Sequence, residues 1–379
     1  MEDEKLQTTG TYILQLVRCA LNGMRASPKP ASISWQDVYA AARFNSIESI
    51  VFFALEASEL PEDLYEKWKQ SVDLALYKNL TFDLARTAIL QEMAKAEFDY
   101  IELKGILLSE YYPKPGMRYM ADNDILYRYG TDIVAAQQKL KAIMEKSGYI
   151  CETLKGNHDI YKKEPFLNFE MHRVLVAEGT QYHSYYKDIW SKAVPMEGCH
   201  GAYGLKAEDV YLYTVVHSHK HYRSTGCGLR SLIDLFVFLK AQQDRLDWNY
   251  IDNGLREMEI DSYEKQIRDA ATALFSQDGA PTPEQREFAV EMLGCGTYGT
   301  RRSLVQTGIN NFSDSRFPRI QYVWHRIFLN KRQIQNNFPV FAKHRILIPL
   351  LPIYRVIRSL RRTPGHIAGV LKTVFSYRR

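Results

Sequence analysis

The first 96 residues show the apolar spacing of amphipathic helices. Between residues 8 and 26 the apolar positions fall on one helical face, at Ile13, Leu14, Leu16, Val17 and Leu21, before the stretch SPKPAS breaks the pattern. Ser34 followed three residues later by Asp37 is typical of a capping box, so a second helix should begin there. Helical periodicity then continues through residues 65–97, which predicts a mostly helical N-terminal region, 1–96.

The period changes after residue 97. Short aromatic and branched stretches at 98–105 and 119–128 predict strands, with a helix start between them at 105–112. Residues 131–149 have helix composition and should stop at Gly148. The stretches HDIYKK and FLNFEMHRVLV, separated by Glu164-Pro165, predict a hairpin. The pattern becomes helical again from Ala207 to about residue 312.

These elements predict an α+β fold, a small mixed-sheet module flanked by helical regions. We expect four parts: a helical N-terminal region (1–96), the α+β module (97–200), a helical domain (201–312) and a basic C-terminal extension (313–379). The sequence shows no internal repeat and no low-complexity tract.

Composition narrows the class of protein. The 379 residues are 46% apolar and 25% charged, as in ordinary globular chains. The acidic, polar start MEDEKLQTTG lacks the features of a secretory signal, and no run of 18 apolar residues occurs, so we expect a cytoplasmic protein. Five well-separated cysteines favour reduced thiols over disulfides or a cysteine zinc site.

Charge is distributed unevenly along the chain. Residues 315–379 contain 14 Lys or Arg and no acid, whereas residues 1–314 carry 35 basic against 44 acidic side chains, a net charge of −9. A basic tail on an acidic body suits nucleic acid or an anionic membrane surface, although a solvated basic face is the commoner outcome.

Candidate chemistry begins at the stretch RYMADNDIL, residues 118–126. If it is a strand, Asp122 and Asp124 point to one face, and Asn123 and Ile125 to the other. Two carboxylates on one small patch repel each other unless a cation offsets the charge, and Mg²⁺ suits carboxylate oxygens. The alternative is a polar turn beside an edge strand.

A third carboxylate follows from the stretch NFEMHRV. Strand alternation places Asn168, Glu170 and His172 on one face, and Phe169 and Met171 on the other. An acid pair on one strand and an acid on its neighbour are what a two-metal phosphoryl or nucleotidyl transfer site needs. His172 is a candidate for orienting the Glu170 carboxylate.

Three segments resemble the uncharacterised nucleotidyltransferase family of the polymerase-beta-like superfamily. They are IELKGILLSEYYPKPGMRYMADNDILYR, NFEMHRV, and the His-containing stretch EDVYLYTVVHSHKHYRSTGCGLRSLIDLFVFL at 208–239. The motifs occur in the family's order, and the resemblance covers roughly residues 30–240. It implies transfer of a nucleoside monophosphate from a nucleoside triphosphate to a hydroxyl acceptor, which could be a small molecule, a protein or RNA.

The resemblance also assigns residues. It implies that Asp122, Asp124 and Glu170 are catalytic and hold Mg²⁺ or Mn²⁺. The residues that would contact the nucleotide are Lys104 and Gly105 at the turn, Arg118, which would lie near the phosphates or pin the strand, and His217 and His221. Two departures are visible: Lys104-Gly105 replaces the usual Gly-Ser turn, and Asn123 replaces an apolar residue, so a buried Asn must find hydrogen-bond partners.

Other patterns have less specific interpretations. His217 and His221 share a helical face while His219 points away, so zinc binding is disfavoured and ordinary packing is the main alternative. Arg230 and Asp234, four apart, suggest a structural helix pair. Residues 344–371 combine an apolar face with arginines; Pro349 and Pro352 exclude a membrane span, which leaves an anionic membrane surface or packing across the acidic body.

Two rival functions remain. The chain could be an inactive nucleotide-binding or scaffold protein that keeps the fold, which the altered turn and Asn123 favour and the three acids oppose. It could instead be a regulator that uses its basic tail on nucleic acid or membrane.

Overall fold

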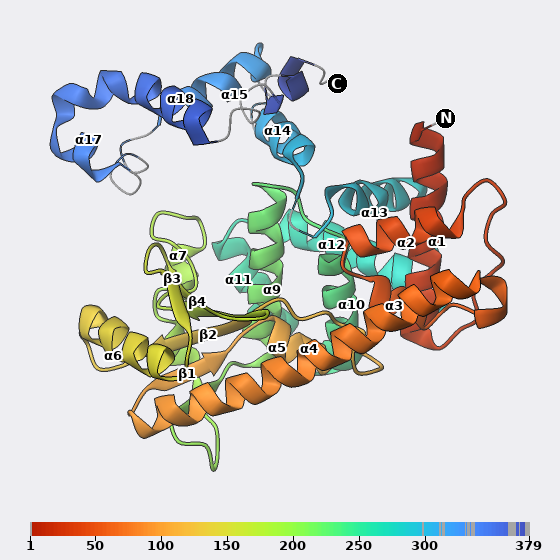
Figure 1. The fold of residues 1–379 in the computed structure, drawn as a ribbon, viewed down its shortest axis with the longest axis horizontal. Helices are drawn as coiled ribbons and strands as arrows, with labels where there is room; N and C mark the ends of the chain where they lie inside the picture. Colours follow the sequence, from red (N-terminus) through yellow and green to blue (C-terminus); the bar gives the residue numbers. More distant parts are fainter. Residues whose placement is uncertain are drawn as a thin grey trace. The chain divides into compact units, whose positions relative to one another are not determined.

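The computed structural model describes residues 2–297, 299–310, 312, 315–329, 331, 334, 338–362, 369–370 and 372–375. The chain forms two units (Figure 1). The first contains Met1–His219 and Gly228–Thr297, and the second contains Lys220–Cys227 and Tyr298–Arg379. Each unit is described by itself below.

The first unit opens with helices, as the apolar spacing predicts. They are α1 (Glu2–Asn22), α2 (Trp35–Phe44), α3 (Glu48–Phe52), the 3₁₀ turn η1 (Ala57–Glu59) and α4 (Glu62–Lys95). The predicted face of α1 is buried, and the helix ends before Gly23, whose φ of +64° suits glycine. The capping box at Ser34 and Asp37 is present, with both reciprocal hydrogen bonds.

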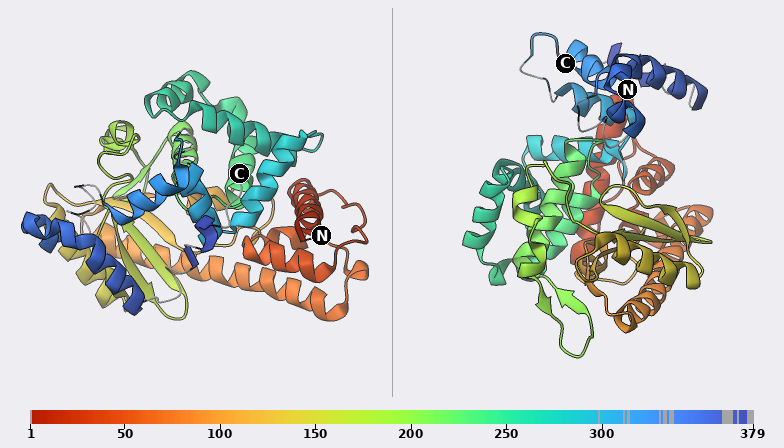
Figure 2. Two further views of the ribbon diagram at one scale, coloured as in Figure 1. Left: turned by 90° about the horizontal axis from the view of Figure 1, so that it is seen from above. Right: turned by 90° about the vertical axis from the view of Figure 1, so that its left-hand side faces the viewer.

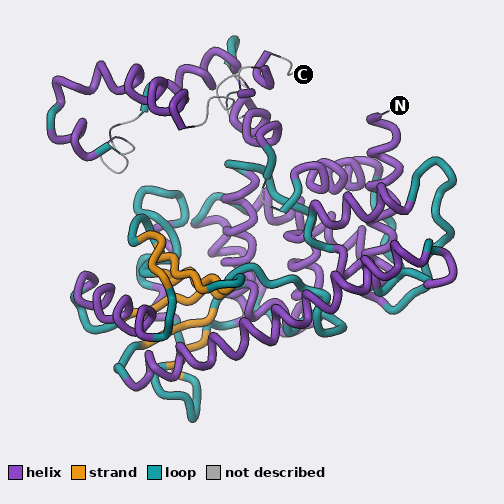
Figure 3. The backbone as a smooth tube through the Cα atoms, viewed as in Figure 1, coloured by secondary structure: helices purple, strands orange, loops and turns teal. Residues whose placement is uncertain are grey.

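A seven-stranded mixed sheet follows, which confirms the predicted α+β class (Figure 3). Its strands are β1 (Asp99–Glu102), β2 (Asn123–Arg128), β3 (Ile150–Thr153), β4 (His158–Lys163), β5 (Leu167–His172), β6 (Val194–Pro195) and β7 (Ala202–Gly204). The order across the sheet is β3-β4-β5-β2-β1-β7-β6. The pairs β2–β5 and β1–β7 are parallel and the other pairs are antiparallel.

The predicted hairpin is β4–β5, and its two strands meet at the Glu164-Pro165 break. The strands β3, β6 and β7 were not predicted. They have two to four residues each and lack a clear alternation of buried and exposed side chains; Ile150 of β3, for example, is 75% exposed. Strands this short, two of which (β3 and β6) are the edges of the sheet, form through their neighbours rather than through their own pattern.

One face of the sheet packs against helices. Side chains of α4 and of α6 (Ile133–Lys146) form a core with the strands, and both helices run alongside the sheet (Figures 1 and 2). The core includes Phe82, Met93, Leu140, Ile125, Tyr127, Phe169 and Met171. Because successive strand residues alternate, Asp124, Glu170 and His172 belong to the opposite face.

Helices complete the first unit. They are the predicted short helix α5 (Gly105–Ser109), α7 (His183–Tyr186), α8 (Ile189–Lys192), α9 (Ala207–Tyr222), α10 (Arg230–Gln242), η2 (Gln243–Arg245), α11 (Trp248–Glu257), α12 (Asp261–Phe275) and α13 (Pro283–Cys295). The last three residues of α9 belong to the second unit. Eight consecutive residues of α10, from Leu232 to Leu239, are buried, so this helix is enclosed on all sides.

The second unit is helical where it is described. It contains α14 (Arg301–Asn310), α15 (Pro318–Ile327), α17 (Pro339–Lys343), η3 (Arg345–Leu350) and α18 (Leu351–Arg362), with a small core of Val305, Ile309, Tyr322 and Val374. No helix among the described residues is long and apolar enough to cross a membrane. Of the predicted basic segments, residues 363–368 and 371 and the arginines at 332, 378 and 379 lie outside the described residues.

Candidate active site

Sheet register brings two of the predicted acids together. In the parallel pair β2–β5, Asp124 lies directly beside Glu170. The Asp124 side chain is 6% exposed and that of Glu170 is 24% exposed. Two carboxylates that are far apart in sequence therefore share one face of the sheet.

Asp122 precedes the strand instead of lying in it, because β2 begins at Asn123. The loop before it is held by hydrogen bonds from three helices to successive backbone carbonyls. Ser49 Oγ donates to Met117 O (3.0 Å), Asn79 Nδ2 donates to Arg118 O (3.0 Å), and Arg230 Nη1 donates to Tyr119 O (3.2 Å). The loop therefore has a defined path up to the acid pair.

Asn123 faces the core, as strand alternation predicts. It is fully buried, and its amide donates to the carbonyl of Phe82 at 3.2 Å. Arg86 Nη1 donates to its side-chain oxygen at 3.4 Å. The buried amide therefore has partners on α4, as a buried Asn requires.

Arg118 pins the loop through a buried ion pair. Its Nε lies 2.8 Å from Asp234 Oδ1 and its Nη2 lies 3.0 Å from Oδ2, while Tyr112 OH donates to Oδ1 at 2.7 Å. The predicted helix pair of Arg230 with Asp234 is wrong in its partner, because Asp234 bonds to Arg118 and Arg230 donates to a loop carbonyl. Of the two expectations for Arg118, pinning the strand fits these contacts.

Gly105 packs against the Arg118 guanidinium. A Cβ placed at residue 105 would lie 2.7 Å from Arg118 Nη1, which is closer than real Cβ contacts. A side chain there would displace the arginine. Glycine at this turn therefore has a packing reason that is independent of any nucleotide.

Lys104 lies inside the acid cluster. Its backbone has φ +37°, a left-handed conformation that is uncommon for lysine, and its Nζ lies 3.4 Å from both oxygens of Asp124. Burial lowers the pKa of the ammonium, but the charges of Asp124, Tyr213, Asp122 and Glu170 together raise it above its ordinary value. The Lys104 side chain is 15% exposed, and the nearby Glu102 pairs with Arg86 at 3.2 Å.

The two aspartates differ in their electrostatics. Burial, and next the charge of Asp124, raise the pKa of Asp122 to about 6, although Lys104 opposes this. Burial also acts to raise the pKa of Asp124, but Lys104 and the hydrogen bond with His172 outweigh it and lower that pKa. The cluster holds more negative charge than its own cations balance, so one carboxyl ionises with difficulty.

Two histidines complete the cluster. His172 Nε2 lies 2.7 Å from Asp124 Oδ1 and 3.8 Å from Glu170 Oε2, so its shorter contact is with Asp124 and the expected contact with Glu170 is longer. His158 was not predicted as a site residue, and its Nε2 lies 3.6 Å from Glu170 Oε2. The hairpin register could have indicated it, because strands that meet at Pro165 pair residue 158 with residue 172.

The histidines of α9 divide between the two units. His217 is close enough to Asp124 to contribute to lowering its pKa. His219 is buried, and its Nδ1 lies 2.9 Å from Tyr182 OH, which fits the expected packing role. His221 belongs to the second unit.

The donor set fits a divalent cation. Asp122, Asp124 and Glu170 offer carboxylate oxygens, the ligands that Mg²⁺ and Mn²⁺ prefer. Burial, and next the charge of Asp124, raise the pKa of Asp122, and a bound cation would favour its ionised form.

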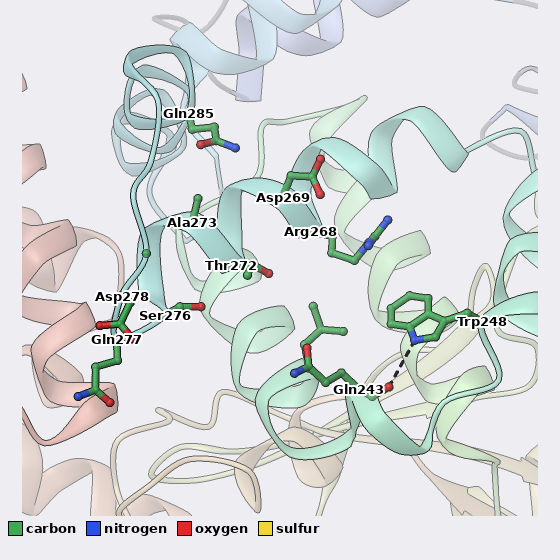
Figure 4. A pocket seen from close by; sticks show the side chains of 12 residues that line it. Gln243, Trp248, Arg268, Asp269, Thr272, Ala273, Ser276, Gln277, Asp278 and Gln285 are labelled. Carbon is green, nitrogen blue, oxygen red and sulfur yellow. Dashed lines mark hydrogen bonds between the residues drawn. The ribbon is translucent and has the colours of Figure 1, made fainter.

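A pocket of about 740 Å³ occurs elsewhere in the first unit (Figure 4). Its lining comes from α10, η2, α11, α12, α13 and the segment between α12 and α13, and includes Trp248, Arg268 and Asp269 but none of the three acids. Trp248 Nε1 donates to the carbonyl of Gln243 at 3.3 Å at its edge. The pocket is therefore separate from the acid cluster.

Comparison with known proteins gives one match. No curated protein and no solved structure matches the chain. A family model described as "uncharacterised nucleotidyltransferase" matches residues 31–276, which include the sheet, the three acids, Lys104, Arg118 and Asp234. The chain belongs to this family of uncharacterised nucleotidyltransferases.

Proposed function

We propose that the chain transfers a nucleoside monophosphate from a nucleoside triphosphate to a hydroxyl group. The main support for this proposal is that strand register places Asp124 beside Glu170. Asp122 lies two residues before Asp124, and the Lys104 ammonium lies among these acids. In the reaction the acceptor oxygen bonds to the α-phosphorus, and the bond from that phosphorus to the bridging oxygen breaks. Pyrophosphate leaves, and the acceptor proton passes to solvent.

Asp122, Asp124 and Glu170 would hold the divalent ions. When bound, these ions would lower the pKa of the attacking hydroxyl and neutralise charge on the departing pyrophosphate. The protein itself fixes Asp124 between Lys104 and His172, so this carboxylate keeps one orientation.

Lys104 has a second role in the proposal. In the nucleotide-free chain its ammonium offsets the carboxylates at 3.4 Å from Asp124. Once divalent ions balance the acids, the same ammonium is available to the triphosphate, where it stabilises charge that moves onto pyrophosphate. Nucleotide affinity should then fall in Lys104→Met, which keeps most of the side-chain length.

Incubation with labelled nucleoside triphosphates and a cell extract tests the proposal and finds the acceptor. Label should appear in one fraction, small molecule, RNA or protein, and only with Mg²⁺ or Mn²⁺. Asp124→Asn should transfer no label. Equal labelling by wild type and Asp124→Asn would contradict the proposal, and absence of both nucleotide binding and labelling would favour the inactive scaffold.

We further propose that the second unit contacts an anionic lipid surface. Helices α15 and α18 expose apolar side chains in a segment without acids, at Ile320, Trp324, Ile353, Val356 and Ile357. Apolar groups beside arginines suit an interfacial helix better than a nucleic-acid contact, which needs little apolar surface.

Sedimentation of the full chain with vesicles tests this contact. Binding to vesicles with anionic lipid should exceed binding to zwitterionic vesicles and should fall in the double variant Arg358→Glu and Arg361→Glu. Equal sedimentation with both vesicle types, or tighter binding to a DNA duplex, would overturn it.

A further inference from the structure

The histidines beside the acid cluster form a group of their own. The ligand atoms of His158, Glu170 and His172 all lie within 4.8 Å of one another. A single carboxylate oxygen, Glu170 Oε2, lies 3.6 Å from His158 Nε2 and 3.8 Å from His172 Nε2. The two imidazole rings are 4.9 Å apart between centroids.

We propose that His158, Glu170 and His172 form a site for a first-row transition-metal ion such as Zn²⁺, next to the carboxylates that would hold Mg²⁺. Two imidazoles and one carboxylate are a common zinc donor set. The site shares only Glu170 with the proposed transfer site. Its existence requires no nucleotide chemistry.

The spacing is close to what such an ion needs. Metal-to-ligand bonds of about 2.0–2.1 Å in a tetrahedron place the ligand atoms about 3.3 Å apart. The nitrogen-to-oxygen separations of 3.6 and 3.8 Å exceed this spacing by about 0.5 Å or less. No pair of ligand atoms in the group is more than 4.8 Å apart, so modest side-chain adjustments would complete the site. Of the described residues, this is the group in which three such ligand atoms converge.

The backbone under the site is regular. His158 and His172 are direct partners in the β4–β5 ladder, and Glu170 lies two residues before His172 on the same sheet face. Ligands on paired strands keep their spacing better than ligands on loops.

The donor types select the ion. Imidazole nitrogen suits Zn²⁺, Co²⁺ and similar ions, whereas Mg²⁺ prefers oxygen ligands throughout. The ion would bind His172 through the lone pair of Nε2, so this nitrogen must carry no proton when the site is filled.

Glu170 belongs both to this site and to the proposed transfer site, so the following expectation rests on the proposed function. An ion that engages Glu170 withdraws this carboxylate from the Mg²⁺ site. Low concentrations of Zn²⁺ should therefore weaken the binding of Mg²⁺ with a non-hydrolysable triphosphate, by competition for a ligand.

Metal titration of the full chain, without a polyhistidine tag, tests the site directly. Co²⁺ should produce visible absorption typical of nitrogen and oxygen coordination, and Zn²⁺ should displace it at one equivalent. His158→Ala should lower Zn²⁺ affinity at least tenfold, as should Glu170→Gln. His200→Ala removes an exposed histidine outside the group and should bind as wild type does.

A folding control and a surface-histidine control are needed to interpret the Zn²⁺ titration. Thermal melting in chelator verifies that each variant is folded, and Glu170→Gln serves as the isosteric variant if His158→Ala melts early. Zn²⁺ affinity unchanged in both folded variants would overturn the site. So would an equal loss in His200→Ala, which indicates binding to surface histidines.

The same titrations separate this site from the transfer site. Asp122→Asn should lose the Mg²⁺-triphosphate complex and retain Zn²⁺, whereas His158→Ala should show the opposite pattern. If wild type binds Zn²⁺ but no triphosphate, the proposed function fails and the metal site stands. If it binds triphosphate with Mg²⁺ but shows no Co²⁺ absorption, the metal site alone fails.

Discussion

Two of the buried charge clusters in the first unit differ in how well their charges are balanced. In one, the Arg118 guanidinium meets both oxygens of Asp234, and Tyr112 adds a hydrogen bond. In the other, the single ammonium of Lys104 faces Asp124 while Asp122 and Glu170 add further negative charge. The first cluster is matched charge for charge, and the second is not.

This difference separates a structural role from a chemical one. A buried ion pair with matched charges and hydrogen bonds connects parts of the fold. Here the pair connects the loop before β2 to helix α10. A cluster with surplus carboxylates destabilises the folded chain until a cation binds. Such a cluster therefore suits ligand binding better than a structural role.

Breaking the matched cluster should cost the most stability. Arg118→Met leaves Asp234 buried without its cation and should lower the free energy of unfolding by about 3–5 kcal/mol. Urea denaturation measures this change. The control is Lys162→Met, which removes an equally short pair with Glu152 (2.7 Å) whose side chains are 55% and 52% exposed, and should cost less than about 1 kcal/mol. Similar costs for the two variants would show that Arg118 does not pin the loop.

Removing Asp124 should affect chemistry more than folding. Asp124→Asn should reduce the rate of nucleotidyl transfer at least about 100-fold, because divalent ions contribute several kcal/mol to such reactions. Asp99→Asn, which alters a partly exposed pair with Arg128, should transfer at the wild-type rate. Initial rates with labelled triphosphate test both variants, and wild-type rates in Asp124→Asn would exclude Asp124 from the reaction.

Lys104 should be a stabilising counterion when no metal is present. In chelator, Lys104→Met should lose about 2 kcal/mol of unfolding free energy, since three carboxylates then lack their ammonium. Mg²⁺ should recover more stability in this variant than in wild type. If chelator and Mg²⁺ give the same difference between the two proteins, the ammonium and the ion do not serve the same acids.

Replacing Asp122 should have the smallest effect on the free energy of unfolding, and the replacement should stabilise the protein. Its pKa is raised to about 6 in the folded chain, so its ionised form destabilises the metal-free protein at neutral pH. Asp122→Asn in chelator should therefore be more stable than wild type by about 1 kcal/mol at pH 7–8.

The pH dependence of this gain follows from the sign of the shift. As pH falls through about 6 towards the unfolded value near 4, wild-type Asp122 takes up a proton in the folded state first and regains stability. The advantage of the Asn variant should disappear by about pH 4. Thermal melting across this range measures it, and an advantage that persists at pH 4 would assign the gain to another cause.

Local patterns were enough to predict much of the fold. The capping box at Ser34, the stop at Gly148, the long helix over residues 62–95 and the hairpin at Pro165 depend on neighbours within a few residues. Alternation along β5 likewise puts Glu170 and His172 on one face and Phe169 on the other, whichever strands lie beside it. These features follow from the sequence because backbone geometry and side-chain period are local properties.

The tertiary structure determined which distant side chains and strands pair with one another. Asp234 bonds to Arg118, 116 residues away, instead of to Arg230 on its own helix, and Lys104 reaches Asp124 across neighbouring strands. Strand register set Asp124 beside Glu170 and helped to bring His158 to the same group, and the short strands β3, β6 and β7 exist only through pairing. No local pattern specifies which distant charges meet, because the packing of the whole unit determines the balance of burial and charge at each site.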